Sequence, residues 1–356
     1  MKSSTFTKFF KLLSLSVLFL GLTTNSLFAK EKKDFKVAWS IYIGYMPLSY
    51  AVQQGIVDKW AKKYDINIEV VQLNDYVEAI NQYTAGAFDS VLMTTMDALT
   101  IPAAGGVDST ILIPSSFSNG NDAIVLKNKS KLEDIKGQRV NLVELSVSHY
   151  LLARGLETVG LSERDISVVN TSDADAIAAY TSNDVTSLVT WNPQLSEIKK
   201  LSDANIVFDS SDIPGEIIDS FVVNTQTLKD NPSLGKALTG AWYEVMEIVK
   251  NQDKEALTFM AESSGTDIEG FKGQLASTML FSNAKDALKF VESADVLNTM
   301  KKVSEFSFDH GLLGDGAENA EFIGMAFPNG KTYGDKNNIK LRFDSTFIKM
   351  AAEGKL

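Results

Sequence analysis

Near its amino terminus, the sequence alternates between short apolar runs and longer amphipathic segments. The apolar runs are Val37–Trp39, Ile66–Leu73 and Val91–Met93, and two helix-like segments, 47–64 and 74–85, lie between them. This order of strand, helix, strand, helix and strand is typical of a parallel sheet covered by helices. Because ligands bind outside the carboxyl ends of parallel strands, we predict that the loops after these strands form the rim of a site.

A second alternation of the same kind follows further along the chain. Residues 139–208 contain short apolar strands separated by helical segments, whereas the sequence from Thr225 to His310 lacks strand alternation and is predicted to be helical. The tail after Gly311 is glycine-rich and polar. We therefore predict an α/β protein of two lobes, with a ligand cleft between them and a hinge of two crossings near 123–128 and 216–222. The predicted domains are a leader, 1–29, a first lobe, 30–125 and 221–356, and a second lobe, 126–220.

The first 29 residues have the pattern of a secretory signal peptide. Lysines at positions 2, 8 and 11 precede the apolar run Leu12–Leu22, which is too short to span a bilayer comfortably. Ser26–Ala29 offers a cleavage site, although Leu27 is larger than usual at its place. We expect a cleaved leader and a periplasmic protein, and an uncleaved membrane anchor is the alternative.

Cysteine content and charge narrow the function classes. The 356-residue chain contains no cysteine, so we expect no disulfide, no thiolate nucleophile and no lipid-modified cysteine anchor. Its net charge is −11, and removal of a leader that carries three lysines makes the charge more negative. Nucleic acids require a basic face, which an acidic protein of this kind lacks, so no nucleic-acid partner is expected.

The sequence lacks the common signatures of catalytic and metal sites. Its two histidines, His149 and His310, do not belong to a metal-binding motif, and HExxH, P-loop and GxSxG motifs are absent. His149 could approach the cleft from an early helical position, but a histidine on a helix surface is the more common case. His310 is interpreted as a charge at a helix carboxyl end. We therefore predict a protein that is not an enzyme and that uses no metal and no cofactor.

Aromatic residues mark the predicted rim more clearly. Trp39, Tyr42 and Tyr45 lie at or after the first strand. Trp191 follows a strand of the second lobe and directly precedes Asn192. Rings from both lobes suit a small planar ligand, or a cation held over a ring face. For Trp39, a place in the core is as well supported as a place in the site.

Carboxylates stand at several strand ends and crossings, where they would decide the charge of the ligand. Asp97 has an alternative role in helix capping, whereas an acid at the place of Glu144 has no routine structural task. An anion binder would instead be expected to keep helix N-termini free of acids and to supply arginine, and no arginine lies in a predicted rim loop. The candidate ligand-binding acids are Asp97, Asp122, Glu144 and Asp219. The hydroxyl residues at the same turns, which an anion binder would use as hydrogen-bond donors, are Thr94, Thr95, Ser146 and Ser148.

Two segments of the first predicted lobe resemble a known family. Solute-binding proteins of ABC transporters, in the group that binds sulfonates, nitrate and thiamine precursors, are similar to WSIYIGYMPLSYAVQQGIVDKW (39–60) and INQYTAGAFDSVLMTTMDALTIPAAGGVDSTILI (80–113). Within this group, the sequence most resembles the urea-type binding proteins encoded beside urea carboxylase, which have been linked to guanidine. Fungal thiamine-pyrimidine synthases also resemble this fold, but their cysteine-rich motif is absent here.

This resemblance implies a two-lobed periplasmic binding protein of the type II-like kind. Such a protein is a monomer that captures a small-molecule ligand and docks on the membrane permease of an ABC importer. Together with the acids and rings, the resemblance favours guanidinium or urea as the ligand. The alternatives are a small anion such as a sulfonate or nitrate, a heterocycle of the thiamine-precursor type, a sensory role, and an enzyme acting on a nitrogen-rich small molecule.

Overall fold

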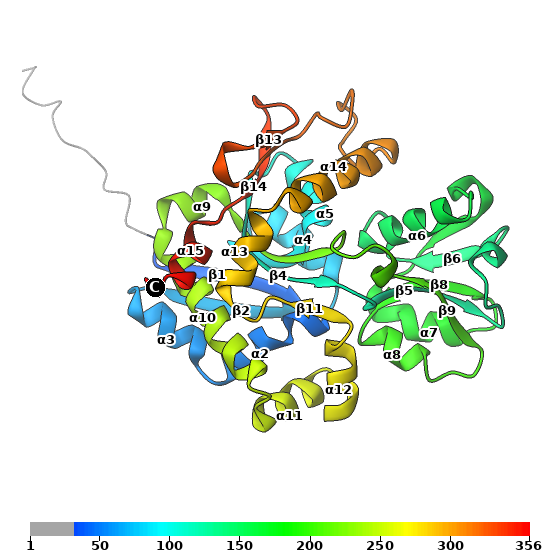
Figure 1. Cartoon of the computed structure of the whole chain (residues 1–356), viewed down its shortest axis with the longest axis horizontal. Helices are drawn as coiled ribbons and strands as arrows, with labels where there is room; N and C mark the ends of the chain where they lie inside the picture. Colours follow the sequence, from blue (N-terminus) through cyan, green and yellow to red (C-terminus); the bar gives the residue numbers. More distant parts are fainter. Residues whose placement is uncertain (1–31) are drawn as a thin grey trace, which may run out of the picture. The chain divides into compact units, whose positions relative to one another are not determined.

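The computed structural model describes residues 32–356, so the predicted signal peptide, 1–29, lies outside the described residues. Residues 33–356 form one compact unit. This unit contains two sheets, and Figure 1 shows each of them accompanied by helices. Within the described residues, no helix combines the length and the apolar character needed to cross a membrane.

The first sheet contains the strands predicted near the amino terminus. Among the described residues its order is β13-β12-β14-β4-β10-β3-β1-β2, with β11 paired to β4. β1 runs parallel to β2 and β3, whereas β10 runs antiparallel to β3 and β4. The bounds are β1 Asp34–Ser40, β2 Asn67–Leu73, β3 Ser90–Thr94, β4 Ser109–Ser118, β10 Ile218–Asn224, β11 Thr278–Leu280, β12 Gly324–Ala326, β13 Thr332–Tyr333 and β14 Ile339–Phe343.

The strands at the carboxyl end of the chain were not predicted, because the tail after Gly311 is only recognisable as glycine-rich and polar. β14 joins the first sheet by parallel pairing with β4, and β12 pairs with β14. These strands are two to five residues long. Their partners are supplied from distant parts of the sequence, and strand formation depends strongly on such neighbours, so the local pattern does not reveal them.

Local signals set several helix boundaries in the first lobe. Pro47 lies in the first turn of α2, and the Asp75 carboxylate accepts a hydrogen bond from the Glu78 N–H at 2.7 Å at the start of α4. The single helix expected over 47–64 is divided by Gly55, whose φ is 64°. The bounds are α2 Met46–Gln53, α3 Ile56–Lys63, α4 Tyr76–Thr84, α5 Thr95–Ala98, α9 Thr225–Asp230, α10 Pro232–Lys250, α11 Lys254–Ser263, α12 Ile268–Leu275, α13 Ala284–Val291, α14 Ala294–Asp309 and α15 Thr346–Ala352.

The second sheet, with its helices, forms the second lobe, which is green in Figure 1. Its order in the described chain is β7-β6-β8-β5-β9, in which β6 is parallel to β7 and β8, and β5 is antiparallel to β8 and β9. The bounds are β5 Asp122–Lys127, β6 Arg139–Leu142, α6 Val147–Thr158, β7 Ser167–Asn170, α7 Ala176–Thr181, β8 Ser187–Trp191, α8 Gln194–Ile198 and β9 Ala204–Asp209.

The chain crosses between the two sheets twice. β4 of the first sheet ends at Ser118 and β5 of the second begins at Asp122, while the return lies between Asp209 and Ile218. β5 therefore lies wholly in the second lobe and β10 wholly in the first. This corrects the predicted lobe boundaries, both of which fall inside a strand.

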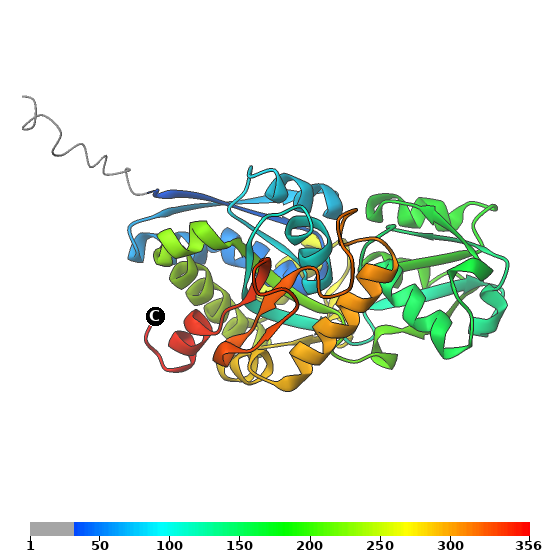
Figure 2. The same ribbon diagram turned by 90° about the horizontal axis from the view of Figure 1, so that it is seen from above.

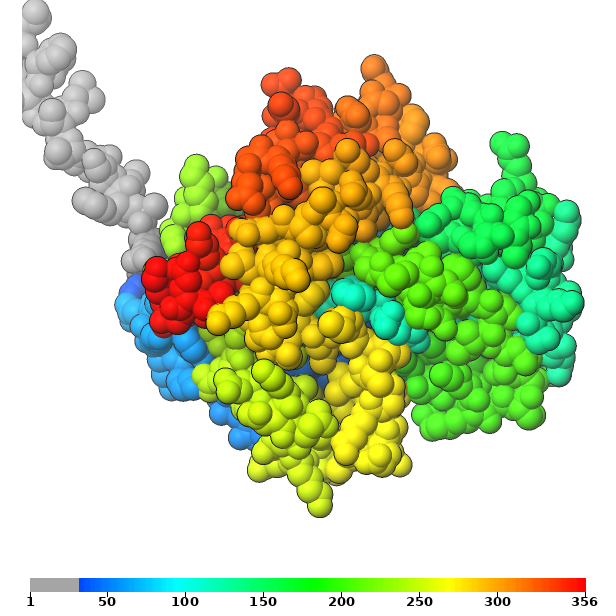
Figure 3. Space-filling model, in the orientation of Figure 1, coloured from blue at the N-terminus to red at the C-terminus, as the bar shows by residue number. Residues whose placement is uncertain are grey.

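Helices from the carboxyl-terminal part of the chain reach the second lobe. Figure 2 shows α14, in orange, extending towards the green lobe, and in Figure 3 the orange and green surfaces meet on the face shown. The two lobes are thus in contact both at the crossings and through α14.

The interior of the first lobe is apolar; for example, the buried Trp242 ring of α10 packs edge-on against Phe221 of β10, with ring centroids 5.0 Å apart.

Candidate functional site

A small cavity lies between the two lobes, at the carboxyl ends of β1, β3 and β8. The space that the centre of a water molecule could occupy in it is about 20 Å³. Since one water needs roughly 10–15 Å³ by this measure, the closed cavity suits a ligand of only a few heavy atoms. The lining residues are Ser40, Tyr42, Tyr45, Tyr76, Thr94 and Asp219 from the first lobe, Asp122, Val147 and Trp191 from the second, and Ile217 from the return crossing.

The turn after β1 places two tyrosines in the lining. Ile43–Tyr45 forms a single 3-10 turn, and the rings of Tyr42 and Tyr45 meet edge-on with centroids 4.8 Å apart. Gly44 makes this packing possible, because a Cβ at that position would lie 2.6 Å from the Tyr42 ring. Burial raises the pKa of both tyrosine hydroxyls well above 10, so both stay protonated and act as hydrogen-bond donors.

Asp219 of β10 accepts hydrogen bonds from three hydroxyl groups. Its Oδ2 atom lies 2.9 Å from the Tyr42 hydroxyl and 2.7 Å from Ser116 Oγ, and its Oδ1 atom lies 3.3 Å from the Tyr45 hydroxyl. The side chain is buried, and burial raises the pKa of Asp219 to about 7; the Ser116 bond opposes this effect, while Asp122 adds to it. The arrangement of donors is that expected around an ionised carboxylate.

Asp122 brings a second buried acid to the cavity from the other lobe. It is the first residue of β5 and pairs with Trp191 of β8, so the acid and the indole share one edge of the second sheet. Its carboxylate accepts a hydrogen bond from the Ser118 hydroxyl, which in turn lies 2.6 Å from Ser210 Oγ. Burial raises the pKa of Asp122 to about 7, and the Ser118 bond opposes this.

Asp97 lies directly behind the cavity wall. Its Oδ2 atom accepts hydrogen bonds from the Tyr76 hydroxyl at 2.6 Å and from Thr94 Oγ1 at 2.8 Å, and both of those residues line the cavity. Burial raises the pKa of Asp97 to about 6, against the lowering effect of these two bonds and of the Val147 N–H at the start of α6. A carboxylate of the first lobe thus faces the helix terminus of the second lobe where an anion would otherwise be expected.

The aromatic lining comes from both lobes, as the sequence predicts. Trp191 of β8 meets Tyr76 of α4 edge-on, with ring centroids 5.7 Å apart and planes at 68°. Tyr76 was not among the predicted site residues. The signal that could have revealed it is its place at the start of the helix that follows the second predicted strand. The sequence also misses Ser40, Val147 and Ile217.

The structure corrects the expectation for Glu144. This residue is exposed and lines a separate surface hollow with Leu145 and Ser146, not the cavity. The reason is local: after the buried end of β6 the chain turns outward, and Leu145 takes a left-handed backbone conformation with a φ of 64°. An acid at a strand end is therefore not sufficient evidence for a place in a cleft.

Four further predicted residues are buried near the site without lining the cavity: Trp39, Thr95, Ser146 and Asn192. Trp39 lies inside β1, and its place in the core, the alternative considered above, is the one observed. Ser146 caps α6, because its Oγ accepts the Ser148 N–H at 3.2 Å. Asn192 joins the lobes by donating to Ser277 Oγ at 3.2 Å.

Comparison with known proteins identifies a family. The sequence model described as NMT1/THI5 like matches residues 44–256. The Taurine-binding periplasmic protein of Escherichia coli (strain K12) is 23% identical over 192 residues, which cover 53% of this chain and 56% of that protein. The chain therefore matches little more than half the length of this relative.

Solved structures share the fold. The alkanesulfonate-binding protein SsuA from Xanthomonas axonopodis pv. citri, bound to MOPS, has a TM-score of 0.67 and 18% identity, covering 81% of this chain and 96% of that one. The periplasmic nitrate-binding protein NrtA from Synechocystis PCC 6803 has a TM-score of 0.64 and 13% identity, covering 91% and 89%. At these identities the likeness shows the fold, which confirms the predicted two-lobed α/β architecture of periplasmic binding proteins.

The names of these relatives bear on two further predictions. All three are binding proteins, which agrees with the prediction that the chain is not an enzyme. Their names mention taurine, alkanesulfonate and nitrate, so the urea- and guanidine-binding subgroup stays a prediction. From the family match over residues 44–256, together with the shared fold, we conclude that the chain belongs to the NMT1/THI5-like family.

Proposed function

We propose that the protein is the periplasmic solute-binding component of an ABC importer, and that it delivers a small planar cation of the guanidinium kind to a membrane permease. The observation that carries this proposal is the charge of the cavity. Asp122 and Asp219 line it from opposite lobes, and among the described residues no lysine or arginine does so. A cation placed between two carboxylates gains charge-assisted hydrogen bonds from both lobes at once, which favours the closed form.

The same charges disfavour an anion. A sulfonate or nitrate in this cavity would need both carboxylates protonated, yet Asp219 already receives hydrogen bonds from Tyr42 and Ser116. The start of α6, which would otherwise attract an anion, faces the carboxylate of Asp97. Charge repulsion in the cavity and the carboxylate at the start of α6 therefore both disfavour the binding of an anion.

Size and shape also support a ligand of this kind. Guanidinium and urea have four heavy atoms, and a flat group of that size is compatible with the limited space of about 20 Å³ for water centres. The rings of Trp191, Tyr42 and Tyr45 provide faces and edges for a planar ligand, and a cation gains further energy over an aromatic face.

A small anion is the second candidate, and the names of the relatives favour it. Taurine, alkanesulfonate and nitrate appear in those names. Nitrate is as small and flat as guanidinium, so volume does not separate the two. Charge separates nitrate from guanidinium. As Asp122 and Asp219 take up protons, anion binding should strengthen, whereas cation binding should weaken.

Calorimetry with guanidinium, urea, nitrate and taurine at pH 8 and pH 6 tests the proposal. We expect guanidinium to bind at pH 8 and to bind more weakly at pH 6. Asp219→Asn should weaken it on the order of 10- to 100-fold, as expected for loss of a hydrogen bond to a charged group. Glu144→Gln is the matched control, since it removes an exposed acid outside the cavity and should change nothing. Tight nitrate or taurine binding that is strongest at pH 6, with guanidinium inert, would establish the anion instead.

A further inference from the structure

α14 of the first lobe packs against α6 of the second, away from the cavity. The Phe306 ring of α14 meets the Tyr150 ring of α6 edge-on, with centroids 5.0 Å apart. It also stacks on His310, at 4.0 Å, just beyond the end of α14. This ring contact adds to the covalent link that the two chain crossings provide, so the interactions that stabilise it also hold the lobes together.

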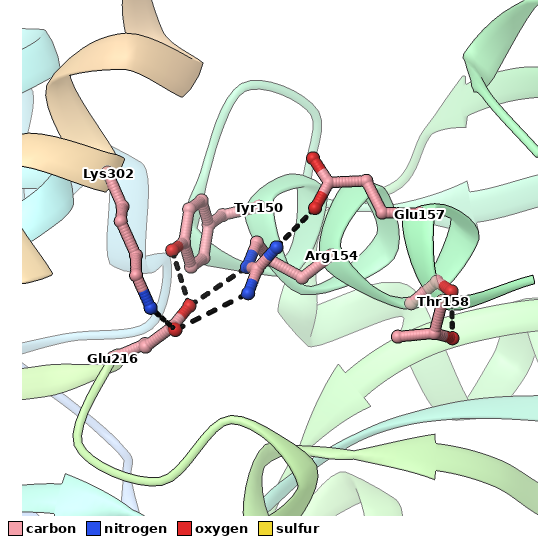
Figure 4. Close-up of polar contacts among 7 residues, drawn as sticks. Tyr150, Arg154, Glu157, Thr158, Glu216 and Lys302 are labelled. Atoms are coloured by element: carbon pink, nitrogen blue, oxygen red, sulfur yellow. Dashed lines mark hydrogen bonds and ion pairs between the residues drawn. The ribbon is translucent and has the colours of Figure 1, made fainter. Parts of the chain in front are cut away.

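One part of this interface is an ion cluster around Glu216, shown in Figure 4. The buried Glu216 lies in the return crossing and accepts hydrogen bonds from the Tyr150 hydroxyl at 2.6 Å, Arg154 Nε at 2.9 Å and Lys302 Nζ at 2.6 Å. Burial alone would raise the pKa of Glu216, but these bonds lower it. Arginine and lysine stay charged through neutral pH, so this cluster joins α6 to α14 without responding to pH in that range.

A second cluster in the same interface contains the chain's only two histidines. Glu163, in the second lobe, contacts both of them: its Oε2 atom lies 2.8 Å from His310 Nε2, and its Oε1 atom meets His149 Nε2. His149 is 5% exposed and belongs to α6, whereas His310 follows α14. One carboxylate therefore links a histidine of its own lobe to a histidine of the other lobe.

The hydrogen bonds on the far side of each ring define where the protons lie. His149 Nδ1 accepts the Leu145 N–H at 3.1 Å, so a neutral His149 ring carries its proton on Nε2, the nitrogen that contacts Glu163 Oε1. His310 Nδ1 lies 2.8 Å from the Phe306 carbonyl oxygen, which can only accept, so that nitrogen carries a proton. His310 Nε2 therefore needs a second proton to bond to Glu163, and the imidazolium form of His310 completes the cluster.

A metal ion is the competing interpretation of this cluster. The three possible ligand atoms lie within 4.8 Å of one another, and two imidazoles with a carboxylate form a donor set that zinc accepts. A zinc ion on His149 Nε2 would require a proton on Nδ1, however, and the Leu145 N–H already points at that atom. The hydrogen bonds favour protons over a metal.

We propose that His310, Glu163 and His149 form a pH-sensitive latch that holds the two lobes together when His310 is protonated and releases them when it is not. The latch belongs to the empty protein and does not depend on the identity of the ligand. The neighbouring Glu216 cluster supplies a constant, pH-independent contact beside it.

The pH range follows from the groups that face His310. The hydrogen bond to Glu163 raises the pKa of His310 above 6.5; burial opposes this, while the Phe306 carbonyl and Asp309 add to it. Burial would raise the pKa of Glu163, but the two histidines outweigh it and hold it at about 2. The latch is therefore complete from about pH 4.5 to 6.5, weakens as pH rises through the raised pKa of His310, and weakens on the acid side as pH falls from about 4.5 through 2. Arg154 of α6 and Lys302 of α14 meet at the carboxylate of Glu216 in the neighbouring cluster.

Nitrogen-15 NMR of the imidazoles tests the proton positions directly. With only two histidines, and a purification tag free of histidine, each ring can be followed separately. We expect His310 to be protonated on both nitrogens at pH 6 and to titrate above 6.5. For His149 we expect a proton on Nε2 and none on Nδ1, because Nδ1 accepts the Leu145 N–H. Addition of zinc at micromolar concentration should leave both spectra unchanged. A neutral His310 at pH 6, or loss of the Nε2 protons on zinc addition, would overturn the proposal.

The lobe separation tests the consequence. Because the chain has no cysteine, Asp184→Cys in the second lobe and Lys250→Cys in the first can carry a pair of spin labels at exposed positions. We expect the empty protein to shift towards the separated form between pH 6 and pH 9, with about tenfold change in the ratio of the two forms for each unit by which the pKa of His310 differs between them.

Variants separate the latch from the acids of the cavity, which also respond to pH. Glu163→Gln and His310→Gln should each increase the separated fraction at pH 6 and reduce its dependence on pH, and the double variant should add little to either. Asp309→Asn is the control, since it changes a charge beside His310 while leaving the bond to Glu163 in place. Equal pH dependence in the wild type and in His310→Gln would refute the latch.

Discussion

At the scale of single residues, the chemistry of the cavity rests on carboxylates that are buried close to one another. Burial is the largest influence on Asp122 and Asp219, and it raises the pKa of each to about 7. Near neutral pH each of these acids is therefore protonated in part of the empty molecules. A cation reverses this, because it stabilises the ionised forms.

Cation binding should therefore release protons. We expect the affinity for guanidinium to increase as pH rises through about 7 and to level off above it, because both acids are then ionised before the ligand arrives. Calorimetry in two buffers of different ionisation enthalpy measures the protons released. No release at pH 6.5, with unchanged affinity from pH 6 to pH 8, would contradict the assignment of these acids to the ligand.

The same acids govern the stability of the empty protein. Their folded-state pKa of about 7 exceeds the ordinary 3.8, so protonation favours the folded state, and this contribution is lost as pH rises from about 4 through 7. The melting temperature of the empty protein should fall over this range, and millimolar guanidinium should restore part of the loss at pH 8. Asp219→Asn should melt with a weaker dependence on pH, whereas Glu144→Gln should follow the wild type.

Trp191 offers a direct test of ring contact. Its indole lines the cavity beside Asp122 and is held edge-on to Tyr76. Trp191→Ala should weaken guanidinium binding by about 1–3 kcal/mol, the combined effect of a lost aromatic contact and a lost cation–π contact. The affinity is measured by calorimetry, with circular dichroism to show that the variant is folded. An unchanged affinity in the folded variant would assign Trp191 a packing role alone.

At the scale of elements, short turns decide which side chains reach the ligand. The turn after β1 contains Gly44, against which the Tyr42 ring packs so closely that even a methyl group would collide with it. The position is critical because Tyr42 both lines the cavity and donates to Asp219. A substitution at Gly44 should therefore disturb the hydrogen bonds that Asp219 accepts.

Gly44→Ala tests this coupling. The added Cβ would lie 2.6 Å from the Tyr42 ring and 3.0 Å from Ser116 Oγ. Tyr42 and Ser116, two of the three hydroxyl donors to Asp219, should therefore shift. We expect destabilisation of about 1–3 kcal/mol, as for overpacking in a core, together with weaker guanidinium binding. Gly273→Ala in α12 is the control, because a Cβ there meets nothing within 4 Å. Denaturant unfolding and calorimetry compare the two, and equal behaviour would show that the turn has room to adjust.

The limits of prediction from sequence follow from the same turns. β1, β2 and β3 could be predicted, because each forms a local apolar run, and the residues after them form the rim, because parallel strands end at one edge. β14 could not, since its partner β4 lies far away in the sequence. Glu144 was misplaced because a single left-handed residue, Leu145, turns the chain outward. Backbone conformation at such a residue has no periodic signal.

At the scale of the whole molecule, both cavity acids stand next to the chain crossings. Asp122 begins β5 directly after the first crossing, and Asp219 is the second residue of β10 after the return. Rotation of the lobes about the crossings would therefore move these acids less than residues far from them. We expect the acids to stay close to each other in the separated form, and Trp191 and Tyr76, which meet across the lobes, to report the closure.

The raised pKa values of Asp122 and Asp219 also bear on which cations the empty cavity would admit. Two bare carboxylates would attract sodium and potassium ions as well as an organic cation. Where Asp122 or Asp219 carries a proton, an alkali ion has to displace it, and such an ion has no N–H groups that could donate hydrogen bonds to the carboxylates. A planar cation with several N–H groups can donate hydrogen bonds to both carboxylates. Protonation of these acids should therefore weaken the binding of alkali ions near neutral pH, and a captured planar cation would release the protons to the solvent.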